Sequence, residues 1–496
     1  LHDRGRRQRG SFVHMTRRSR LVRWIVWALG CAAGAPGALG QSLPALSVSP
    51  ESRPNTKHAV RHPVVMTVTD TTAVITWETD EPADTVLRYG PHRDRLDTAA
   101  RGDGRATRFH GCELRGLRPG TVYHFRCGEQ AADIADGNPC GGSFRTLVPP
   151  PGELLFAFAT MTDLHIGQQR VARVAVRGKV VSEGIRWREP GLAFWQLTVG
   201  AAIDEINAGD AAFTIVKGDI ADAGSVEWFS TARRLLDGLT RPYHVARGNH
   251  DALNPLLRAF GLPRSWYSFD HQGIHFVVLD TESFATAQDP DRERQLAWLA
   301  EDLRAARGRW TLVFGHRPIL PLLTRTAGEA WTEDLLYFGE GLARRWYGDG
   351  AVGAFEKATG RRPQVSTTVA RRLAGLFRSH GRIAGVFAGH LHRNYVGSWP
   401  EETGNLPYVE TASTKEYPCG YAITRVCTGG YMQSYHTPLD PRCLEWSAMT
   451  RDAYARLGWQ SKAGATAERN FVVRFDAINL RPAVATTRGA VGSGKP

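Results

Sequence analysis

The sequence predicts a large α/β domain preceded by a small all-β domain. Two observations support this fold class. Between about residues 62 and 147 the chain has short alternating runs separated by turn residues, whereas after residue 153 apolar strand-like runs alternate with helical stretches. A chain of 496 residues is also too long for one ordinary domain, and its 42% hydrophobic and 22% charged residues are typical of globular proteins.

The first 40 residues have the layout of a secretory signal. From Met15, a basic start is followed by a short apolar stretch and by small residues that end at Ala38-Leu39-Gly40, which suits a cleavage site. The apolar stretch is too short and too interrupted to span a bilayer, and no later run could cross one. We therefore expect an exported protein, whether periplasmic, secreted or at the cell surface, with a linker at residues 41–61 and a disordered tail at 481–496.

The formal net charge of +13 is concentrated in the same N-terminal segment. Residues 1–40 contain eight arginines and one aspartate, which account for +7 and leave +6 for the rest of the chain. This mild excess would favour anionic substrates, but it indicates no specific nucleic-acid surface. The sequence does not define an oligomeric state.

Residues 62–147 are predicted to form a small β-sandwich. The run "AVITWETDEPADTVLRYG" reads as two strands separated by Asp80-Glu81-Pro82, with Trp77 in the core. The stretch "LRGLRPGTVYHFRC", which ends at Cys127, resembles the tyrosine corner of fibronectin type III domains, with Tyr123 as the corner residue. We expect this module to be a spacer or a docking surface. Cys127 and Cys140 could bridge two of its neighbouring strands, because an exported chain permits disulfides.

Residues 153–480 are predicted to form the α/β domain. A helical stretch, "RERQLAWLAEDLRAA", places Leu296, Leu299 and Leu303 on one face. Five strand-like runs of this domain end in polar residues that can bind metals: Asp163 and His165; Asp219 and Asp222; Asn249, His250 and Asp251; His316; and His390 and His392. In open α/β folds the carboxyl ends of strands form the ligand-binding edge.

Buried Asp and His side chains are unfavourable unless they are paired or bound to a cation. Glycines at positions 218, 248, 315 and 389 would let the backbone turn sharply and come close to such a centre. Each short motif is common by itself, but the ordered set predicts a metal centre.

The ordered set resembles that of the calcineurin-like metallophosphoesterases over about residues 154–396. Its motifs are Asp-x-His, Gly-Asp-x-x-Asp, Gly-Asn-His-Asp, Gly-His and Gly-His-x-His. The resemblance implies a two-sheet αββα sandwich and two divalent or trivalent metal ions, with mixed nitrogen and oxygen ligands that suit iron, manganese or zinc. It assigns the first metal to Asp163, His165 and His392, the second to Asn249, His316 and His390, and a bridge between them to Asp219.

The resemblance also implies an activity. A metal-bridging hydroxide would attack phosphorus and hydrolyse phosphomonoesters or phosphodiesters. His250 would serve the leaving oxygen, with Asp251 or Asp163 placed to orient it, or else His250 would only support the ligands. Arg247, Arg317 and Arg393 each flank a ligand and could bind phosphate oxygens, or they could be ordinary surface arginines.

A fibronectin-like domain ahead of a phosphoesterase resembles the layout of purple acid phosphatases, but the motifs differ. That group has an iron-binding tyrosine where this chain has Asp222, and Asp-x-Gly where this chain has His165. We therefore expect no tyrosinate colour and an active site more similar to that of bacterial phosphodiesterases.

Two segments are candidates for shaping the substrate pocket. Residues 317–381 form a long insertion with several aromatic residues, and "STKEYPCGYAITRVCTGGYMQSYH" follows the last motif. The aromatic residues, which could stack on a base or a sugar, are Trp331, Tyr337, Phe338, Trp346 and Tyr347. A plain packed subdomain is the alternative for either segment.

Two other functions are weighed against the phosphoesterase. A metal-dependent nuclease is disfavoured by the modest basicity of the chain. A non-catalytic cell-surface binding protein with a retired phosphoesterase site is disfavoured because every expected ligand position is filled.

Overall fold

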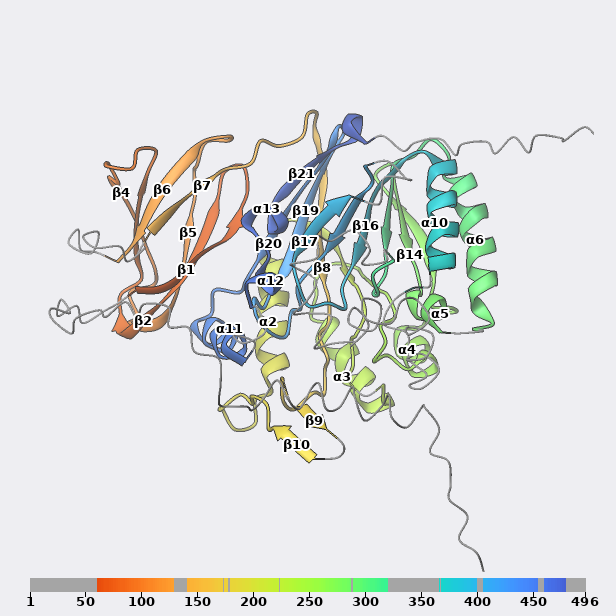
Figure 1. Ribbon diagram of the computed structural model, residues 1–496, viewed down its shortest axis with the longest axis horizontal. Coiled ribbons are helices and arrows are strands. Elements are labelled where there is room, and N and C mark those ends of the chain that lie inside the picture. The colour runs from red at the N-terminus through yellow and green to blue at the C-terminus, as the bar shows by residue number, and fades with distance from the viewer. Residues whose placement is uncertain are drawn as a thin grey trace, which may run out of the picture. The chain divides into compact units, whose positions relative to one another are not determined.

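The computed structural model describes most of the chain between residues 60 and 478 (Figure 1). The described residues are 60–128, 141–172, 174–176, 179–222, 224–286, 289–319, 365, 367–398, 405–453 and 459–478. They all belong to one compact unit, Lys57–Pro496. The expected signal segment, the tail, Cys140 and the aromatic residues of the insertion lie outside the described residues.

The N-terminal part is a β-sandwich of two antiparallel sheets. Its first strand already begins at Val60, just inside the expected linker. One sheet has the order β1-β2-β5, and its strands are β1 Val60–Val68, β2 Ala73–Ala83 and β5 Thr107–Leu114. The other has the order β4-β3-β6-β7, and its strands are β3 Val86–Gly90, β4 Thr98–Arg101, β6 Val122–Cys127 and β7 Gly141–Arg145.

Two predicted features of the sandwich are confirmed. Trp77 is only 3% exposed and stacks on the ring of His110, with 4.9 Å between the ring centroids. The hydroxyl of Tyr123 accepts a hydrogen bond from the backbone N–H of Arg118 at 3.0 Å, which is the contact that defines a tyrosine corner. Buried and less buried residues alternate along β6, as expected for strands that pack on one face only.

The larger part contains two six-stranded sheets. The first sheet has the order β12-β11-β8-β19-β20-β21. Its strands are β8 Leu154–Met161, β11 Ala211–Val216, β12 Tyr243–Val245, β19 Tyr421–Cys427, β20 Gly430–His436 and β21 Phe471–Arg474. The first three of these are parallel, and the last three extend the sheet with antiparallel pairing.

The second sheet has the order β13-β14-β15-β16-β18-β17. Its strands are β13 Tyr267–His271, β14 Ile274–Val278, β15 Thr311–Phe314, β16 Ile383–Ala388, β17 Tyr395–Ser398 and β18 Pro407–Glu410. Four strands in the middle of the order run parallel, and antiparallel strands close both edges. Strands β14 and β16 are buried along their whole length, which explains why both are apolar apart from His275 of β14, whose ring bonds to Asp270 and Asp302.

Helices cover the outer face of each sheet. The first sheet packs against α2 Phe194–Ala208, α3 Val226–Leu236, α4 Leu253–Phe260 and α11 Pro441–Ala453. The second sheet packs against α5 Thr281–Ala285, α6 Asp291–Ala305 and α10 Thr367–His380, and α6 and α10 lie side by side in Figure 1. The expected αββα architecture is therefore confirmed.

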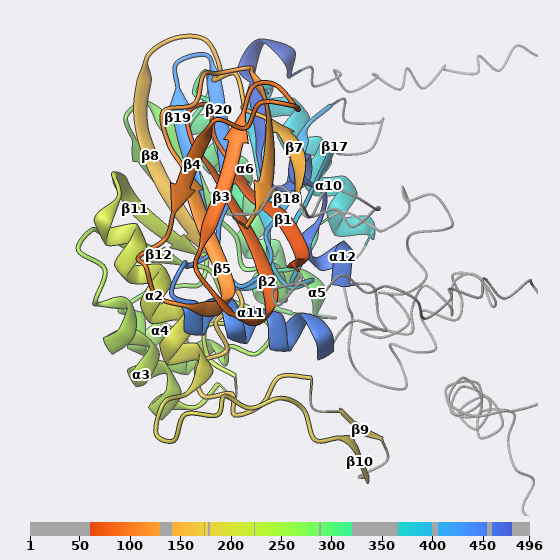
Figure 2. The same ribbon diagram turned by 90° about the vertical axis from the view of Figure 1, so that its left-hand side faces the viewer.

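Smaller elements complete the described chain. The hairpin of β9 Val174–Val176 and β10 Lys179–Ser182 lies away from both large sheets in two views (Figures 1 and 2). Three short helices precede or follow the last strand: α12 Trp459–Ala463, α13 Thr466–Arg469 and the 3-10 helix η5 Phe475–Ala477. Within the described ranges, no helix has both the length and the apolar character needed to cross a membrane.

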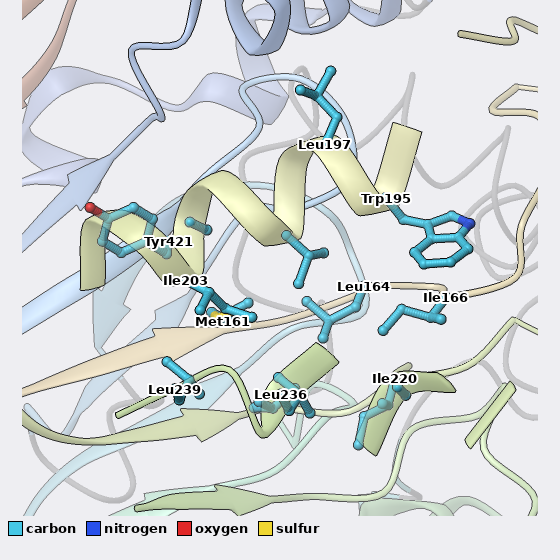
Figure 3. Packing of buried hydrophobic residues seen from close by; sticks show 14 of the residues in the cluster. Met161, Leu164, Ile166, Trp195, Leu197, Ile203, Ile220, Leu236, Leu239 and Tyr421 are labelled. Carbon is cyan, nitrogen blue, oxygen red and sulfur yellow. The ribbon is translucent and has the colours of Figure 1, made fainter. Parts of the chain in front are cut away.

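Apolar side chains hold the layers together. Between the sheets, Phe158 of β8 packs edge-on against Phe314 of β15 at 5.9 Å, and Phe213 of β11 packs edge-on against Phe276 of β14 at 5.2 Å. Outside the first sheet, Ile203 of α2 lies beside Met161 of β8 (Figure 3). Burial of each such side chain contributes roughly 1.5–3 kcal/mol.

The helix prediction for α6 is also confirmed. Leu296, Leu299 and Leu303 are at most 3% exposed, and all three belong to the apolar cluster between α6 and the second sheet. Their spacing of three and four residues places them on one face of the helix.

The two sheets bring their carboxyl ends to the same place. Lys217, which follows β11 in the first sheet, donates from Nζ to the carbonyl oxygen of Ala388 at the end of β16 in the second sheet, at 2.9 Å. Asp163, after β8, donates its N–H to Gly218, after β11, at 3.0 Å. The polar residues that follow these strands therefore converge.

Candidate metal centre

All seven expected metal ligands follow the carboxyl ends of strands, and the structure gathers six of them into two groups. Asp163, His165 and His392 form one group, and Asp219, His316 and His390 form the other. Within each group the side-chain ligand atoms lie within 4.8 Å of one another. The first group is the set that the family resemblance implies for the first metal, and the second contains His316 and His390 of the other implied set, with Asp219 in place of Asn249.

Asp219 lies between the two groups. Its Oδ2 is 3.5 Å from Nε2 of His165 in the first group and 3.2 Å from Nε2 of His316 in the second. Asn249, the seventh expected ligand, places its Oδ1 3.1 Å from the same Nε2 of His316. A carboxylate in this position can contact cations on both sides.

Three of the histidines are held by their outer nitrogen. In each case Nδ1 bonds to an oxygen outside the centre and Nε2 is left to face inward. The pairs are His165 with Asp222 Oδ1 at 3.1 Å, His316 with the carbonyl oxygen of Lys217 at 2.8 Å, and His392 with Glu416 Oε1 at 2.7 Å. Such outer hydrogen bonds fix the tautomer and the ring orientation of metal-binding histidines.

The two carboxylates are held in the same way. Oδ2 of Asp163 accepts from the hydroxyl of Thr162 at 2.6 Å and from the N–H of His390 at 3.0 Å. Oδ1 of Asp219 accepts from the N–H of His250 at 2.8 Å. Each carboxylate therefore keeps one oxygen, Oδ1 of Asp163 and Oδ2 of Asp219, directed at the histidines of the centre.

Two of the inward atoms show that these residues suit a cation. Oδ1 of Asp163 and Nε2 of His165 are fully buried and have no hydrogen-bond partner among the described residues. An unsatisfied buried polar atom is unfavourable by about 1–3 kcal/mol, and native structures contain few of them. A metal ion between these atoms would satisfy both, and a mixed set of carboxylate, amide and imidazole donors fits iron, manganese or zinc.

The electrostatics of the centre agree with this interpretation. Burial raises the pKa of Asp219, but the neighbouring His316 outweighs it and holds the pKa well below its usual range. Burial lowers the pKa of His316, but Asp219 and Asp163 raise it to about 10. The buried carboxylates thus attract positive charge strongly, and metal ions would supply it.

The backbone at the ligands adopts an uncommon conformation. Five of the ligands have a positive φ: Asp163 at 54°, His165 at 44°, Asp219 at 49°, His390 at 70° and His392 at 51°. A left-handed conformation is rare in residues with a side chain and costs about 1–3 kcal/mol each. Strain of this kind concentrates at functional sites, where the surrounding structure holds it in place.

Two glycines let the ligand loops touch. A Cβ on Gly248 would lie 2.1 Å from the backbone nitrogen of Asp219, and one on Gly389 would lie 2.0 Å from Oγ1 of Thr162. Neither glycine has a positive φ, so both are required for close approach rather than for an unusual turn.

His250 and Asp251, of which the second is one of two candidates to orient the first, lie beside the ligands and have different partners. His250 is 40% exposed, and its Nδ1 donates to the carbonyl oxygen of Asp222 at 2.9 Å. The carboxylate of Asp251 is buried and accepts from the backbone N–H groups of Gly248 and Ile220, at 2.8 and 3.0 Å. Asp251 therefore fastens two ligand loops together, and the carboxylate near the His250 ring is that of Asp222, 3.7 Å away.

Arg317 lies against one of the ligands, His390. Its Nε pairs with Glu282 Oε1 at 2.7 Å, and its Nη1 is 3.3 Å from Nε2 of His390. Two contacts fix the guanidinium of Arg247. Its Nη1 lies 3.2 Å from Asp280 Oδ2, and its Nε donates to the carbonyl oxygen of Asp251 at 3.0 Å.

Arg393 faces a different environment. It is 3% exposed, pairs with the buried carboxylate of Glu410, and lies over the ring of Tyr395 at 5.4 Å. These contacts place its guanidinium beside the strands β17 and β18.

The sequence does not single out several residues that hold the ligands. Glu416 and Lys217 belong to no motif, although a lysine inside the apolar run "FTIVKGD" indicates that the fold supplies it with a buried partner. Asp222 is part of the Gly-Asp-x-x-Asp motif, but only the structure shows that its carboxylate contacts His165. Asp280 and Glu282, which orient two arginines, lie at the start of a five-residue helix that the sequence does not reveal.

Comparison with known families agrees with the geometry. A model of the family described as "Calcineurin-like phosphoesterase" matches residues 157–394, and a model described as "Purple acid Phosphatase, N-terminal domain" matches residues 61–141. The two matches together cover more than half of the chain.

Individual relatives are distant. Purple acid phosphatase 21 of Arabidopsis thaliana is 24% identical over 279 residues, which cover 49% of this chain and 53% of that protein. Glycerophosphodiester phosphodiesterase GpdQ of Enterobacter lignolyticus (strain SCF1) is 32% identical over 117 residues, which cover 22% of this chain and 42% of that protein. The chain thus spans about half the length of the curated relatives it matches.

Among solved structures, the purple acid phosphatase PPD1 from seeds of yellow lupin (Lupinus luteus) is 14% identical, with a TM-score of 0.37 and coverage of 77% of this chain and 73% of that chain. The two family matches fall on the two parts of the structure described above, and all seven expected ligands lie within the larger match. Residues 157–394 therefore match the calcineurin-like phosphoesterases, and residues 61–141 match the N-terminal domain of purple acid phosphatases.

Proposed function

We propose that the protein is an exported two-metal hydrolase of phosphomonoesters or phosphodiesters. The observation that supports this proposal most directly is the convergence of two ligand groups on Asp219, with their outer atoms hydrogen-bonded and their inner atoms facing one another. The relatives named above are a phosphatase and a phosphodiesterase, which favours the same class of reaction.

Under this proposal, Asp163, His165 and His392 hold one metal, Asn249, His316 and His390 hold the other, and Asp219 bridges them. When bound, two such cations polarise a phosphoryl oxygen and lower the pKa of an attacking water.

The residues around the ligands would position the ester and its leaving group. Because Nδ1 of His250 donates to a carbonyl oxygen, its Nε2 is the atom that could pass a proton to the leaving oxygen. Arg317, whose Nε is fixed by Glu282, could direct its remaining N–H groups at a phosphate oxygen beside His390. Arg393 is a weaker candidate for phosphate binding, since Glu410 already neutralises it.

The proposed centre differs from that of a coloured purple acid phosphatase. Asp222 fills the tyrosine position, and its Oδ1 contacts Nδ1 of His165. An iron-loaded protein should therefore lack a tyrosinate absorption band in the visible spectrum.

Export remains part of the proposal because of the N-terminal sequence alone. The basic, apolar and small-residue order from Met15 to Gly40 is typical of a secretory signal. Edman sequencing of the protein recovered from outside the cytoplasm should begin near Gln41.

The central experiment combines metal analysis with turnover of paired substrates. Purified protein loaded with manganese, zinc or iron should contain two metal equivalents and release nitrophenol from mono- or bis-nitrophenyl phosphate, and the ratio of the two rates would define its preference. In the Asp219→Asn variant both metals should bind more weakly and turnover should be lost, because the bridging charge is removed. A folded wild-type protein that stays metal-free and inert after loading would contradict the proposal and favour a binding protein.

A further inference from the structure

The last histidine of the metal centre is held by a carboxylate from outside the family match. Glu416 follows β18 and is 1% exposed, and its Oε1 accepts from Nδ1 of His392 at 2.7 Å. A carboxylate can only accept, so the proton is on Nδ1 and the lone pair of Nε2 is directed inward. That Nε2 lies 3.1 Å from Oδ1 of Asp163, the oxygen without a hydrogen-bond partner among the described residues.

Two buried lysines accompany this carboxylate. Lys462 of α12 places Nζ 3.3 Å from the same Oε1 of Glu416, and Lys415 places Nζ 4.0 Å from Oε2. The side chains of both lysines are at most 6% exposed. A buried carboxylate is unfavourable unless cations and hydrogen bonds surround it, so these ammonium groups keep Glu416 charged beside His392.

The C-terminal helices fix this arrangement in place. The indole N–H of Trp446 on α11 donates to the carbonyl oxygen of Lys415 at 2.6 Å. The carbonyl oxygen of Lys462 accepts from the N–H of Asn394, two residues after His392, at 2.9 Å. Backbone hydrogen bonds therefore hold Lys415, which precedes Glu416, and Lys462 in place beside His392.

The other histidines have different outer partners. Nδ1 of His316 bonds to a neutral backbone carbonyl, and Nδ1 of His165 bonds to Asp222, which is partly exposed. Among these three, only His392 faces a fully buried carboxylate that also contacts a lysine. We therefore expect the first metal site, which includes His392, to depend more on the charge of Glu416 than the second site does.

We propose that Glu416 and Lys462 are positioning residues for His392, so that the segment beyond residue 394 completes the first metal site. This inference rests on the proposed two-metal function. The carboxylate orients the imidazole and increases its donor strength toward a cation, and the lysine holds the carboxylate in place as an anion. The proposal gives neither residue a contact with the substrate.

The test measures the affinity of each metal equivalent by competition with a chelator. Glu416→Ala should weaken one of the two equivalents by about 10–100-fold and leave the other within a factor of about three. Glu416→Gln should weaken the same equivalent less, because the amide oxygen still accepts from Nδ1. The affinity of Lys462→Met for this equivalent should lie between those of the wild type and of Glu416→Ala. Visible spectra of the cobalt-loaded variants should show a change at one metal only.

The matched control is Glu205→Gln. Glu205 is a half-buried glutamate of α2 that accepts from the hydroxyl of Tyr421 at 2.9 Å and from the N–H of Leu439 at 3.0 Å, away from the ligands. This variant should keep both metal affinities.

The outcomes separate the two proposals. If wild type binds no metal, the proposed function fails. If wild type binds two metals and folded Glu416→Gln and Lys462→Met keep both affinities, only the positioning role is wrong, even if Glu416→Ala does not fold. Equal weakening of both equivalents in these variants would also overturn it, since the proposal assigns the contact to one site.

Discussion

His165 and His392 each present one ring nitrogen to a carboxylate outside the centre and the other to its middle. The outer contacts, to Asp222 at 3.1 Å and to Glu416 at 2.7 Å, involve protein groups only. The rings are therefore oriented by the fold, and a cation would meet donors that need little rearrangement. Preorganisation of this kind is what separates a metal site from a chance cluster of polar residues.

His250 offers the sharpest test of the reaction at the residue scale. Its ring lies edge-on to that of His165 at 4.5 Å, yet its Nδ1 is directed at the backbone of Asp222 rather than at the ligand groups. We expect His250→Gln to lower kcat by about 10²–10⁴-fold while two metals remain bound, because only proton transfer is removed. Steady-state kinetics and elemental analysis on the same sample measure both quantities.

His316→Gln is the matched control for that variant. His316 is fully buried, and its Nε2 is directed at Asp219, so its loss should release a metal. If His250→Gln releases a metal as well, His250 is a ligand or its support, and its role as the proton donor is wrong.

At the scale of elements, the loops after the strands must pass within van der Waals distance of one another. Gly248 permits this, since a Cβ there would lie 2.3 Å from Oδ1 of Asp219. We expect Gly248→Ala to displace Asp219 and weaken both metals. Isothermal titration of the variant with manganese measures the loss.

Gly200→Ala is the comparison for the same chemical change. Gly200 lies within α2, and a Cβ added there would have no atom within 4 Å beyond its chain neighbours and the helix backbone. The substitution should leave metal binding unaltered and stabilise the protein by about 0.5–1 kcal/mol, because alanine favours the helix. Normal metal affinity in Gly248→Ala would show that the two loops can move apart without loss of metal binding, and would contradict the prediction.

The elements also show how far the sequence predicts the site. The strand-end ligands are predictable because parallel strands deliver their final residues to one edge, and the two-sheet fold follows from the family motifs. Glu416 and Lys462 are not predictable, since they lie 24 and 70 residues after His392 in ordinary local sequence, and only tertiary packing joins them. The segment 413–436, expected to shape a pocket or to pack as a subdomain, supplies mainly the core strands β19 and β20 of the first sheet.

The core of the N-terminal sandwich contains a histidine that makes its stability depend on pH. His110 is 1% exposed, and its ring nitrogens bond to the hydroxyls of Thr79 and Thr85 at 2.9 and 3.0 Å. Burial lowers its pKa from the ordinary 6.5 to about 4. The unfolded chain therefore binds the proton more readily, so this contribution to stability is present above pH 6.5 and is lost as the pH falls toward 4.

We expect this residue to account for about 2 kcal/mol of acid destabilisation, after a discount for solvent screening. In urea unfolding between pH 4 and 7, His110→Gln should be less stable than wild type at pH 7 but should lose less stability on acidification. His92 is exposed, so in His92→Gln the free energy of unfolding should change with pH as steeply as in the wild type. A His110→Gln variant with that same slope would show that other groups cause the acid sensitivity.

At the scale of the whole molecule, the sandwich is attached to the larger domain by buried and partly buried polar contacts rather than by a linker alone. Asp70 pairs with Arg425 of β19 at 2.9 Å, and Glu78 pairs with Arg451 of α11. Thr67 donates from its hydroxyl to the carbonyl oxygen of Tyr435 at 2.7 Å. These contacts favour a fixed support for the first sheet, and the sequence-based expectation of a spacer or a docking surface stays a prediction.

Arg469 of α13 connects the two parts through one side chain. It is 3% exposed, and its guanidinium donates to the carbonyl oxygens of Val65 and Met66 in β1, at 2.7 and 3.2 Å, and to those of Ala463 and Gly464, at 2.9 and 2.5 Å. One side chain thus satisfies carbonyl groups from both parts of the chain. Its removal takes this donor from Val65 and Gly464, whereas the carbonyl oxygens of Met66 and Ala463 still accept from the side-chain amides of Asn470 and Asn394.

Arg469→Met should therefore destabilise the protein by about 2–4 kcal/mol, through the loss of charged hydrogen bonds and the exposure of unpaired carbonyls. Differential scanning calorimetry should show one transition in the wild type and two in the variant, since the sandwich and the αββα domain would then unfold separately. Arg474→Met, which removes an exposed arginine paired with Asp476 at 2.6 Å, should retain a single transition and nearly the wild-type stability. Two transitions already present in the wild type would mean that the two parts unfold independently, despite the contacts between them.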